Sequence, residues 1–122
     1  MKRLFALRGA TQCENTQDDM CKQIGNMYDE ILVSNKLKED DIVSVMFSVT
    51  SDLNIINPCT ALRLSGRANT DTVLFSSQEP EFNDSLEKVV RVIIHCYLEK
   101  DSKIKHVYRN GTGVLRPDWS KE

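Results

Sequence analysis

The sequence feature that most constrains the fold is an almost unbroken apolar run at residues 89–98, which reads VVRVIIHCYL. A run this rich in β-branched residues is typical of a strand that is buried on both faces. The spacing of Leu86, Val89, Val90 and Ile93 would also suit a helix, but the density of valine and isoleucine favours a strand. We therefore predict a strand over residues 89–98, around which the rest of the chain is organised.

One charged residue, Arg91, interrupts this apolar run. A buried charge without a partner costs several kcal/mol, so Arg91 needs a nearby anion. That anion is either Glu79, at the end of the preceding segment 73–79, or a group that the protein binds. A structural ion pair would explain these two residues alone. Arg8 and Tyr108 stand at the ends of other expected strands, however, and together they favour a binding site.

The other elements follow from periodicity and end signals. Met20, Ile24, Met27 and Ile31 recur at helical spacing after the capping sequence TQDD at residues 16–19. A second helix is expected between the pair Asn-Pro at residues 57–58 and a glycine at residue 66. The predicted helices span residues 18–35 and 59–65, the predicted strands span residues 3–7, 42–49, 72–75, 89–98 and 104–108, and a last extended piece covers residues 114–117.

This order of elements predicts an α/β (α+β) fold for residues 1–122 as a single domain. The expected sheet is mixed and five-stranded, with helices on one face. Its uncovered face would need a partner, so we expect an oligomer.

Composition excludes several classes of function. The formal net charge of −2 argues against non-specific binding to nucleic acid, although a local cluster of arginines can still attract an anionic small molecule. No apolar run is long enough to cross a membrane and no signal peptide is apparent, so we expect a cytoplasmic protein without membrane partners. The spacing of the cysteines and histidines does not match that of zinc ligands, so no metal is expected. These residues are Cys13, Cys21, Cys59, Cys96, His95 and His106.

Seven short motifs follow one another in an order that is similar to a known family. They are LRGAT at residues 7–11, SDL at 51–53, ALRLSG at 61–66, QE at 78–79, VRV at 90–92, HVY at 106–108 and LRPD at 115–118. In this order they resemble the AroH-type monofunctional chorismate mutases, over nearly the whole chain. The resemblance implies a homotrimeric pseudo-α/β barrel with active sites between subunits. It also implies rearrangement of chorismate to prephenate without a cofactor or metal.

The resemblance also assigns site residues. Arg8, Glu79, Arg91 and Tyr108 match the principal catalytic residues of the family. The substrate-binding set would comprise Leu115 and Arg116 from a C-terminal segment over the site, Arg63 from the neighbouring subunit's cleft wall, and Cys59, Thr60, Leu74, Phe75 and Ser76. Three positions depart from the family pattern: Asn57 replaces a phenylalanine, Thr60 a lysine and Ser76 a cysteine. Loss of the lysine removes one cation from the cleft mouth.

The expected chemistry suits these residues. The rearrangement is unimolecular and moves no proton in its bond-changing step, so it needs a held conformer and fixed charges. We assign Arg91 to the ether oxygen and a carboxylate of chorismate. Arg8 and Tyr108 would hold a carboxylate, with Arg63 assisting from the next subunit. Glu79 would bind the ring hydroxyl and face the developing positive charge.

Two other readings stay open at the level of sequence. One is a Rid-like imine/enamine deaminase, which is also trimeric and binds small acids with an arginine at subunit interfaces. The other is a non-catalytic module that binds an anionic metabolite, which the changes at Asn57 and Thr60 would suit. Loss of chorismate absorbance, enamine turnover, or binding without turnover would separate the three.

Overall fold

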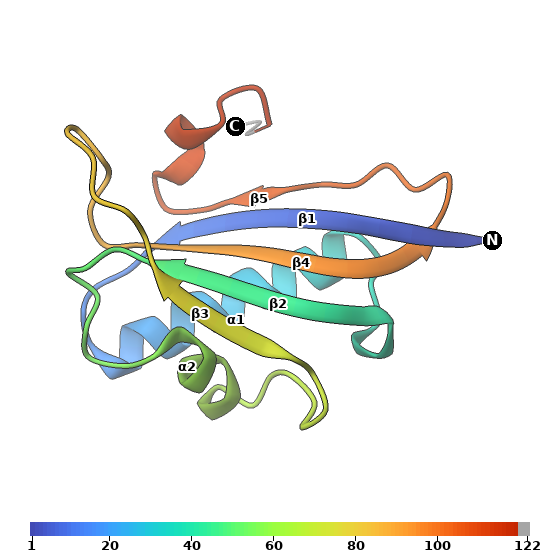
Figure 1. The fold of residues 1–122 in the computed structure, drawn as a ribbon, viewed down its shortest axis with the longest axis horizontal. Coiled ribbons are helices and arrows are strands. Elements are labelled where there is room, and N and C mark those ends of the chain that lie inside the picture. Colours follow the sequence, from blue (N-terminus) through green and yellow to red (C-terminus); the bar gives the residue numbers. More distant parts are fainter. Residues whose placement is uncertain (120–122) are drawn as a thin grey trace.

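The computed structural model describes residues 1–119 of the 122-residue chain, and one sheet organises them (Figure 1). The strands lie in the order β3-β2-β4-β1-β5. This confirms the predicted five-stranded sheet and the predicted order of strands and helices. The elements are β1 (Lys2–Gln12), α1 (Gln17–Ser34), the 3-10 helix η1 (Glu39–Asp41), β2 (Ile42–Val49), α2 (Pro58–Leu64), β3 (Leu74–Gln78), β4 (Val89–Glu99), β5 (Val107–Tyr108) and the 3-10 helix η2 (Thr112–Leu115).

The apolar run at residues 89–98 forms the central strand of this mixed sheet. β4 pairs antiparallel with β1 on one side and with β2 on the other. The outer strands run parallel to their neighbours, β5 beside β1 and β3 beside β2. The strand alternative at residues 89–98 is therefore confirmed and the helical one is wrong.

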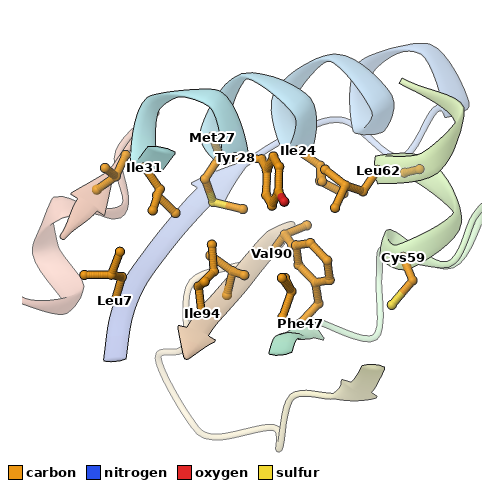
Figure 2. Close-up of a cluster of buried hydrophobic side chains, with 14 of the residues drawn as sticks. Leu7, Ile24, Met27, Tyr28, Ile31, Phe47, Cys59, Leu62, Val90 and Ile94 are labelled. Carbon is orange, nitrogen blue, oxygen red and sulfur yellow. The ribbon is translucent and has the colours of Figure 1, made fainter. Parts of the chain in front are cut away.

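The core lies between the sheet and the two helices, which cover the same face (Figures 1 and 2). α1 presents its predicted apolar stripe to the sheet, and α2 packs beside it at the β2 end (Figure 2). Burial of this stripe, rather than helix propensity alone, stabilises α1 against the sheet. The fully or nearly fully buried residues of this layer include Leu7, Met20, Ile24, Met27, Ile31, Phe47, Leu62, Val90 and Ile94.

The prediction that the central strand is buried on both faces is wrong for the single chain. Val90, Val92 and Ile94 are buried toward the helices, whereas Arg91 and Ile93 on the opposite face are only partly buried. Side chains alternate along a strand, and this chain supplies helices to one face only. The second face of the sheet is therefore open, and it carries Arg91.

Both predicted helix starts are confirmed. The Thr16 hydroxyl accepts a hydrogen bond from the Asp19 N–H at 3.1 Å, and Asn57 Oδ1 accepts one from the Cys59 N–H at 2.8 Å. α2 ends as predicted at Gly66, whose φ of +83° is left-handed. The Gly66 N–H bonds the Arg63 carbonyl and the Arg67 N–H bonds the Leu62 carbonyl, which is the Schellman arrangement.

The extended piece predicted at residues 114–117 is wrong, because Thr112–Leu115 form the 3-10 helix η2. The chain turns before it through two left-handed residues, Asn110 at φ +54° and Gly111 at φ +89°. The buried Thr112 hydroxyl then lies 2.7 Å from the Arg109 carbonyl oxygen and 3.1 Å from that of Ala10, which ties the turn to β1. These contacts anchor the backbone of the sequence NGTG at residues 110–113.

Three strands differ in extent from their predictions. β1 was predicted over residues 3–7 but spans Lys2–Gln12, so Arg8 lies within this strand and not at its end. β3 begins two residues later than expected and runs on to Gln78, while β5 keeps only two residues of the predicted 104–108. Among residues 1–119 no helix is both long and apolar enough to span a membrane.

Candidate active site

Arg91 lies near the middle of the sheet, on the face that the helices leave open. It pairs across the ladder with Ala10 of β1 and with Ser48 of β2. Its Nε atom is buried and has no hydrogen-bond partner among residues 1–119, although Glu79 Oε1 lies 3.5 Å away. A guanidinium in this position retains an unused hydrogen-bond donor, which a bound anion could accept from.

Glu79 is held in place from two directions. Its N–H bonds the Val49 carbonyl at 2.7 Å, which extends the β3 ladder by one residue. The Ser48 hydroxyl donates to Glu79 Oε1 at 2.5 Å, and this is the same oxygen that faces Arg91. The carboxylate thus has a fixed orientation, and its side chain is only 22% exposed. Ser48 was not singled out from the sequence.

Tyr108 and Arg8 lie on the same open face as Arg91. Tyr108 pairs with Ala10 in the parallel ladder, so Ala10 stands between Tyr108 and Arg91 across three adjacent strands. Arg8 precedes Ala10 by two residues and therefore points to the same side. The Tyr108 hydroxyl is buried, and no described residue provides it with a hydrogen-bond partner. The structure thus brings the four predicted catalytic residues to one face of the sheet.

A cleft of about 460 Å³ opens beside Arg91 and Glu79. This volume is within the range of small-molecule sites. The loop between β3 and β4 and the residues Val114 and Leu115 of the C-terminal segment form its walls. Arg91 is the one cation among its lining residues in the part of the chain described, against five acids: Asp52, Glu79, Glu81, Asp84 and Glu87.

The other predicted substrate-binding residues gather at a different place, on α2 and β3. Leu74 and Ser76 pair with Val45 and Phe47, whose side chains are buried, and so they face the helix layer. The Ser76 hydroxyl donates to Asn57 Oδ1 at 3.2 Å. A single chain does not bring this group to the cleft, and none of its members lines it: Cys59, Thr60, Arg63, Leu74, Phe75 and Ser76.

Within this α2–β3 group, two side chains remain accessible from outside. Phe75 is 61% exposed on the open face, where it neighbours Met46 of β2. Arg63 is exposed on α2, and its Nη2 lies 3.5 Å from the Thr60 hydroxyl oxygen. Among the described residues, neither the Arg63 guanidinium nor the Phe75 ring is buried against another part of the chain.

The C-terminal segment lies beside the β1–β5 end of the sheet (Figure 1). Leu115 lines the cleft as predicted, but Arg116 forms a two-point contact with Asp118, Nε to Oδ1 at 3.0 Å and Nη2 to Oδ2 at 2.7 Å. Arg116 Cζ lies 3.3 Å from the centre of the Trp119 ring. Trp119 was not predicted to take part in the site.

His106 lies beneath Trp119, with the two ring centres 4.0 Å apart and the planes inclined by 23°. Its Nδ1 accepts the Arg8 N–H at 3.0 Å, so the neutral ring carries its proton on Nε2. Burial, and then the nearby charges of Arg8 and Arg116, lower the pKa of His106 below its ordinary value. His106 therefore adds no positive charge beside the two arginines near neutral pH.

Comparison with known proteins assigns the family. The model of the family described as chorismate mutase type I matches residues 4–119. The chain is 32% identical over 117 residues to chorismate mutase AroH of Bacillus subtilis (strain 168), covering 93% of this chain and 91% of the relative. It is 29% identical over 115 residues to chorismate mutase AroH of Thermus thermophilus, covering 92% and 93%. The structure of a chorismate mutase from Clostridium thermocellum superposes with a TM-score of 0.81 at 40% identity, covering 91% of this chain and 99% of that one.

Proposed function

This chain belongs to the type I chorismate mutases, isomerases of chorismate, and from that premise we propose how its residues act on the substrate. The reaction breaks a C–O bond and forms a C–C bond within one molecule, so it needs neither a general base nor a nucleophile. What the protein supplies is a held reactive conformer and fixed charges that fit the transition state better than the ground state.

Arg91 is the residue that stabilises the breaking bond. Negative charge grows on the ether oxygen as the C–O bond lengthens. Among the described residues, the Arg91 Nε is a buried donor without a partner on the open face, and the planar guanidinium offers further donors in a fixed fork. A donor that is already in place costs no reorganisation when the charge appears, which is how preorganised sites lower a barrier.

Glu79 faces the opposite end of the charge separation. Positive charge develops on the substrate ring in the transition state. The Glu79 carboxylate faces this charge and accepts a hydrogen bond from the ring hydroxyl. The Ser48 hydroxyl occupies one lone pair of Oε1 and leaves the other positions of the carboxylate for substrate. We propose that Ser48 orients Glu79 and does not itself contact the substrate.

Arg8 and Tyr108 hold a substrate carboxylate at the far side of Ala10. The buried Tyr108 hydroxyl lacks a partner within the described residues, and a carboxylate oxygen would satisfy it. Because the cleft lining near Arg91 is mainly acidic, a doubly negative substrate must place its carboxylates toward Arg8 and toward cations from outside this cleft. Arg116 and the neighbouring subunit's Arg63 are the cations proposed for that side.

We propose that the active form is a homotrimer in which α2 and β3 of one chain complete the site of the next. Apolar side chains exposed on the open sheet face support an assembly, because such a face is usually covered by another chain. They include Leu4, Met46, Phe75 and Tyr97. Arg63, Thr60, Ser76, Cys59, Leu74 and Phe75 would then line the site from the partner. Sedimentation equilibrium should give three times the 13.9 kDa chain mass; a monomer that turns over chorismate would contradict this arrangement.

The observation that carries this assignment of residues is the presence, among the described residues, of two buried polar atoms without a hydrogen-bond partner on one face of the sheet. They are Arg91 Nε, whose side chain lines the cleft, and Tyr108 Oη. Purified protein should remove chorismate absorbance faster than spontaneous decay, and the Arg91→Ala variant should not. An Arg91→Ala variant with full activity would contradict the assignment. Enamine turnover or ligand binding without turnover would instead favour a Rid-like deaminase or a non-catalytic binding module.

A further inference from the structure

Trp119 connects residues from the two ends of the chain. Its ring stacks on His106, Arg116 Cζ lies 3.3 Å from its centre, and Arg8 Cζ lies 5.8 Å from its centre. Both guanidinium groups are within the distance at which an aromatic face attracts a cation. Trp119 thus contacts the two arginines that the proposed function assigns to the substrate's carboxylates.

Two guanidinium groups on one small surface repel each other unless something offsets their charge. The described part of the chain places no carboxylate against Arg8, and Asp118 pairs with Arg116 alone. The negative face of the indole ring attracts both cations and, unlike a carboxylate, does not use up their hydrogen-bond donors. Arg8 and Arg116 are therefore both attracted to the Trp119 ring, and Arg116 keeps for a ligand the N–H groups that Asp118 does not bind.

The Trp119 ring is also held in place from its other contacts, by His106 and by the backbone. The His106 ring lies flat against the indole, and its Nδ1 accepts the Arg8 main-chain N–H. The chain turns back at this point through a bond from the Trp119 N–H to the Arg116 carbonyl at 3.0 Å. The indole is thereby fixed relative to the backbone of Arg8. A support fixed in this way can hold the Arg8 side chain in one orientation.

From these contacts we infer that Trp119 is a positioning residue, which holds the side chains of Arg8 and Arg116 ready for a substrate carboxylate. This inference rests on the proposed function, because it uses the same two arginines. It goes beyond it in assigning a role in substrate capture to an aromatic side chain that bears no reacting group.

The matched pair of variants is Trp119→Leu and Trp119→Phe. Leucine keeps an apolar side chain but removes the π face, whereas phenylalanine keeps a smaller π face. A cation–aromatic contact of this kind corresponds to a change in affinity between about twofold and thirtyfold. Trp119→Leu should raise KM for chorismate within this range and change kcat by less than about twofold, and Trp119→Phe should restore much of the loss.

Coupling separates a positioning role from simple anchoring of the segment. If Trp119 acts through Arg116, the effects of Trp119→Leu and Arg116→Ala on KM should be less than multiplicative in the double variant. A merely structural role would lower the melting temperature of Trp119→Leu and leave KM and the coupling unchanged. Independent effects of the two substitutions, or no effect of Trp119→Leu on KM, would overturn the inference.

Fluorescence provides a readout that does not depend on turnover. Trp119 is the sole tryptophan of the chain, so its emission reports this place alone. Prephenate, which retains both carboxylates of chorismate, should change the emission saturably, and Arg116→Ala should shift the midpoint to higher prephenate. No saturable change would count against the inference. Wild-type protein that leaves chorismate untouched but shows the emission change would contradict the proposed function and leave the role of Trp119 in anion capture intact.

Discussion

Arg91 Nε and Glu79 Oε1 face each other across 3.5 Å, and the buried nitrogen forms no hydrogen bond within the part of the chain that the structure describes. At this distance the two groups attract, but the arginine keeps a donor for a ligand. A purely structural pair would be expected to close the gap and satisfy the buried donor. The geometry of the Arg91–Glu79 pair therefore fits a binding site with room for a third group better than a purely structural ion pair.

Replacing Arg91 should remove most of the catalytic rate and leave the fold intact. Loss of one preorganised donor to a developing oxyanion costs roughly 3–4 kcal/mol, or about two to three orders of magnitude in kcat. Arg91→Lys should also be poor, because an ammonium cannot make the forked contact. Steady-state kinetics with a circular dichroism control would check both. Near-normal turnover by Arg91→Lys would show that the role assigned to Arg91 is wrong.

Replacing Ser48 tests whether the orientation of Glu79 matters. Ser48→Ala removes the hydroxyl that donates to Glu79 Oε1, and a hydrogen bond to a charged group contributes about 1.5–3 kcal/mol. We expect kcat/KM to fall by about tenfold. Ser44→Ala, on the same strand and face but distant in register from Arg91, is the matched control and should retain activity. Equal activity of Ser48→Ala and wild type would exclude an orienting role for Ser48.

Substrate affinity should weaken as salt is added. Capture of a dianion by arginines is a charge attraction that ions screen within a Debye length of about 8 Å at physiological ionic strength. KM for chorismate should rise with ionic strength, less steeply than in relatives that keep the lysine at the position of Thr60. A KM that does not respond to ionic strength would argue against a cleft in which arginines dominate binding.

Restoring the missing cation should improve capture. Thr60 lies on α2 one turn before Arg63, and Thr60→Lys would return a positive charge to the proposed cleft mouth. An exposed charge contributes up to about 1 kcal/mol, so KM should fall by no more than about fivefold. Thr60→Met has a side chain of similar length without charge, and should leave KM unchanged. A fall in KM for both variants would mean that packing, not charge, is responsible.

His106 should make the folded protein less stable in acid. Its pKa is lower in the folded chain than its ordinary value of about 6.5, so the unfolded chain binds more protons as the pH falls. The stabilisation from a neutral His106 is present above that ordinary value and is lost as the pH falls through the folded pKa. The melting temperature should therefore drop on acidification. His106→Asn keeps an acceptor for the Arg8 N–H without titrating, and its smaller acid sensitivity would confirm the source.

Much of the fold could be predicted because its signals are local. β2 was predicted with its observed bounds, and α1 within one residue at either end, because alternation and capping residues define such elements. The segment after Gly111 could not be predicted in this way. Its 3-10 turn depends on a buried hydroxyl meeting a carbonyl of β1, which is a contact between residues far apart in the chain.

The site was predictable where it depended on strand ends and less so elsewhere. Arg8, Arg91 and Tyr108 reach one face because the register of β1, β4 and β5 aligns them. Glu79 joins them from the end of β3, which pairs with β2 next to β4. Ser48 could have been found from its place between the buried Phe47 and the apolar Val49, which puts it on the face of Arg91. Trp119 offers no such periodic signal, because it follows the last element and acts through stacking.

The position of β1 has a consequence for how the protein is made. The first strand lies between β4 and β5, and the Arg8 N–H meets its acceptor 98 residues later in the chain. A nascent polypeptide therefore exposes both edges of this strand on the ribosome until nearly all of its partners have emerged. Substrate-binding competence arises only after residues 106–119 have been synthesised, and conditions that delay the emergence of these residues should favour aggregation over folding.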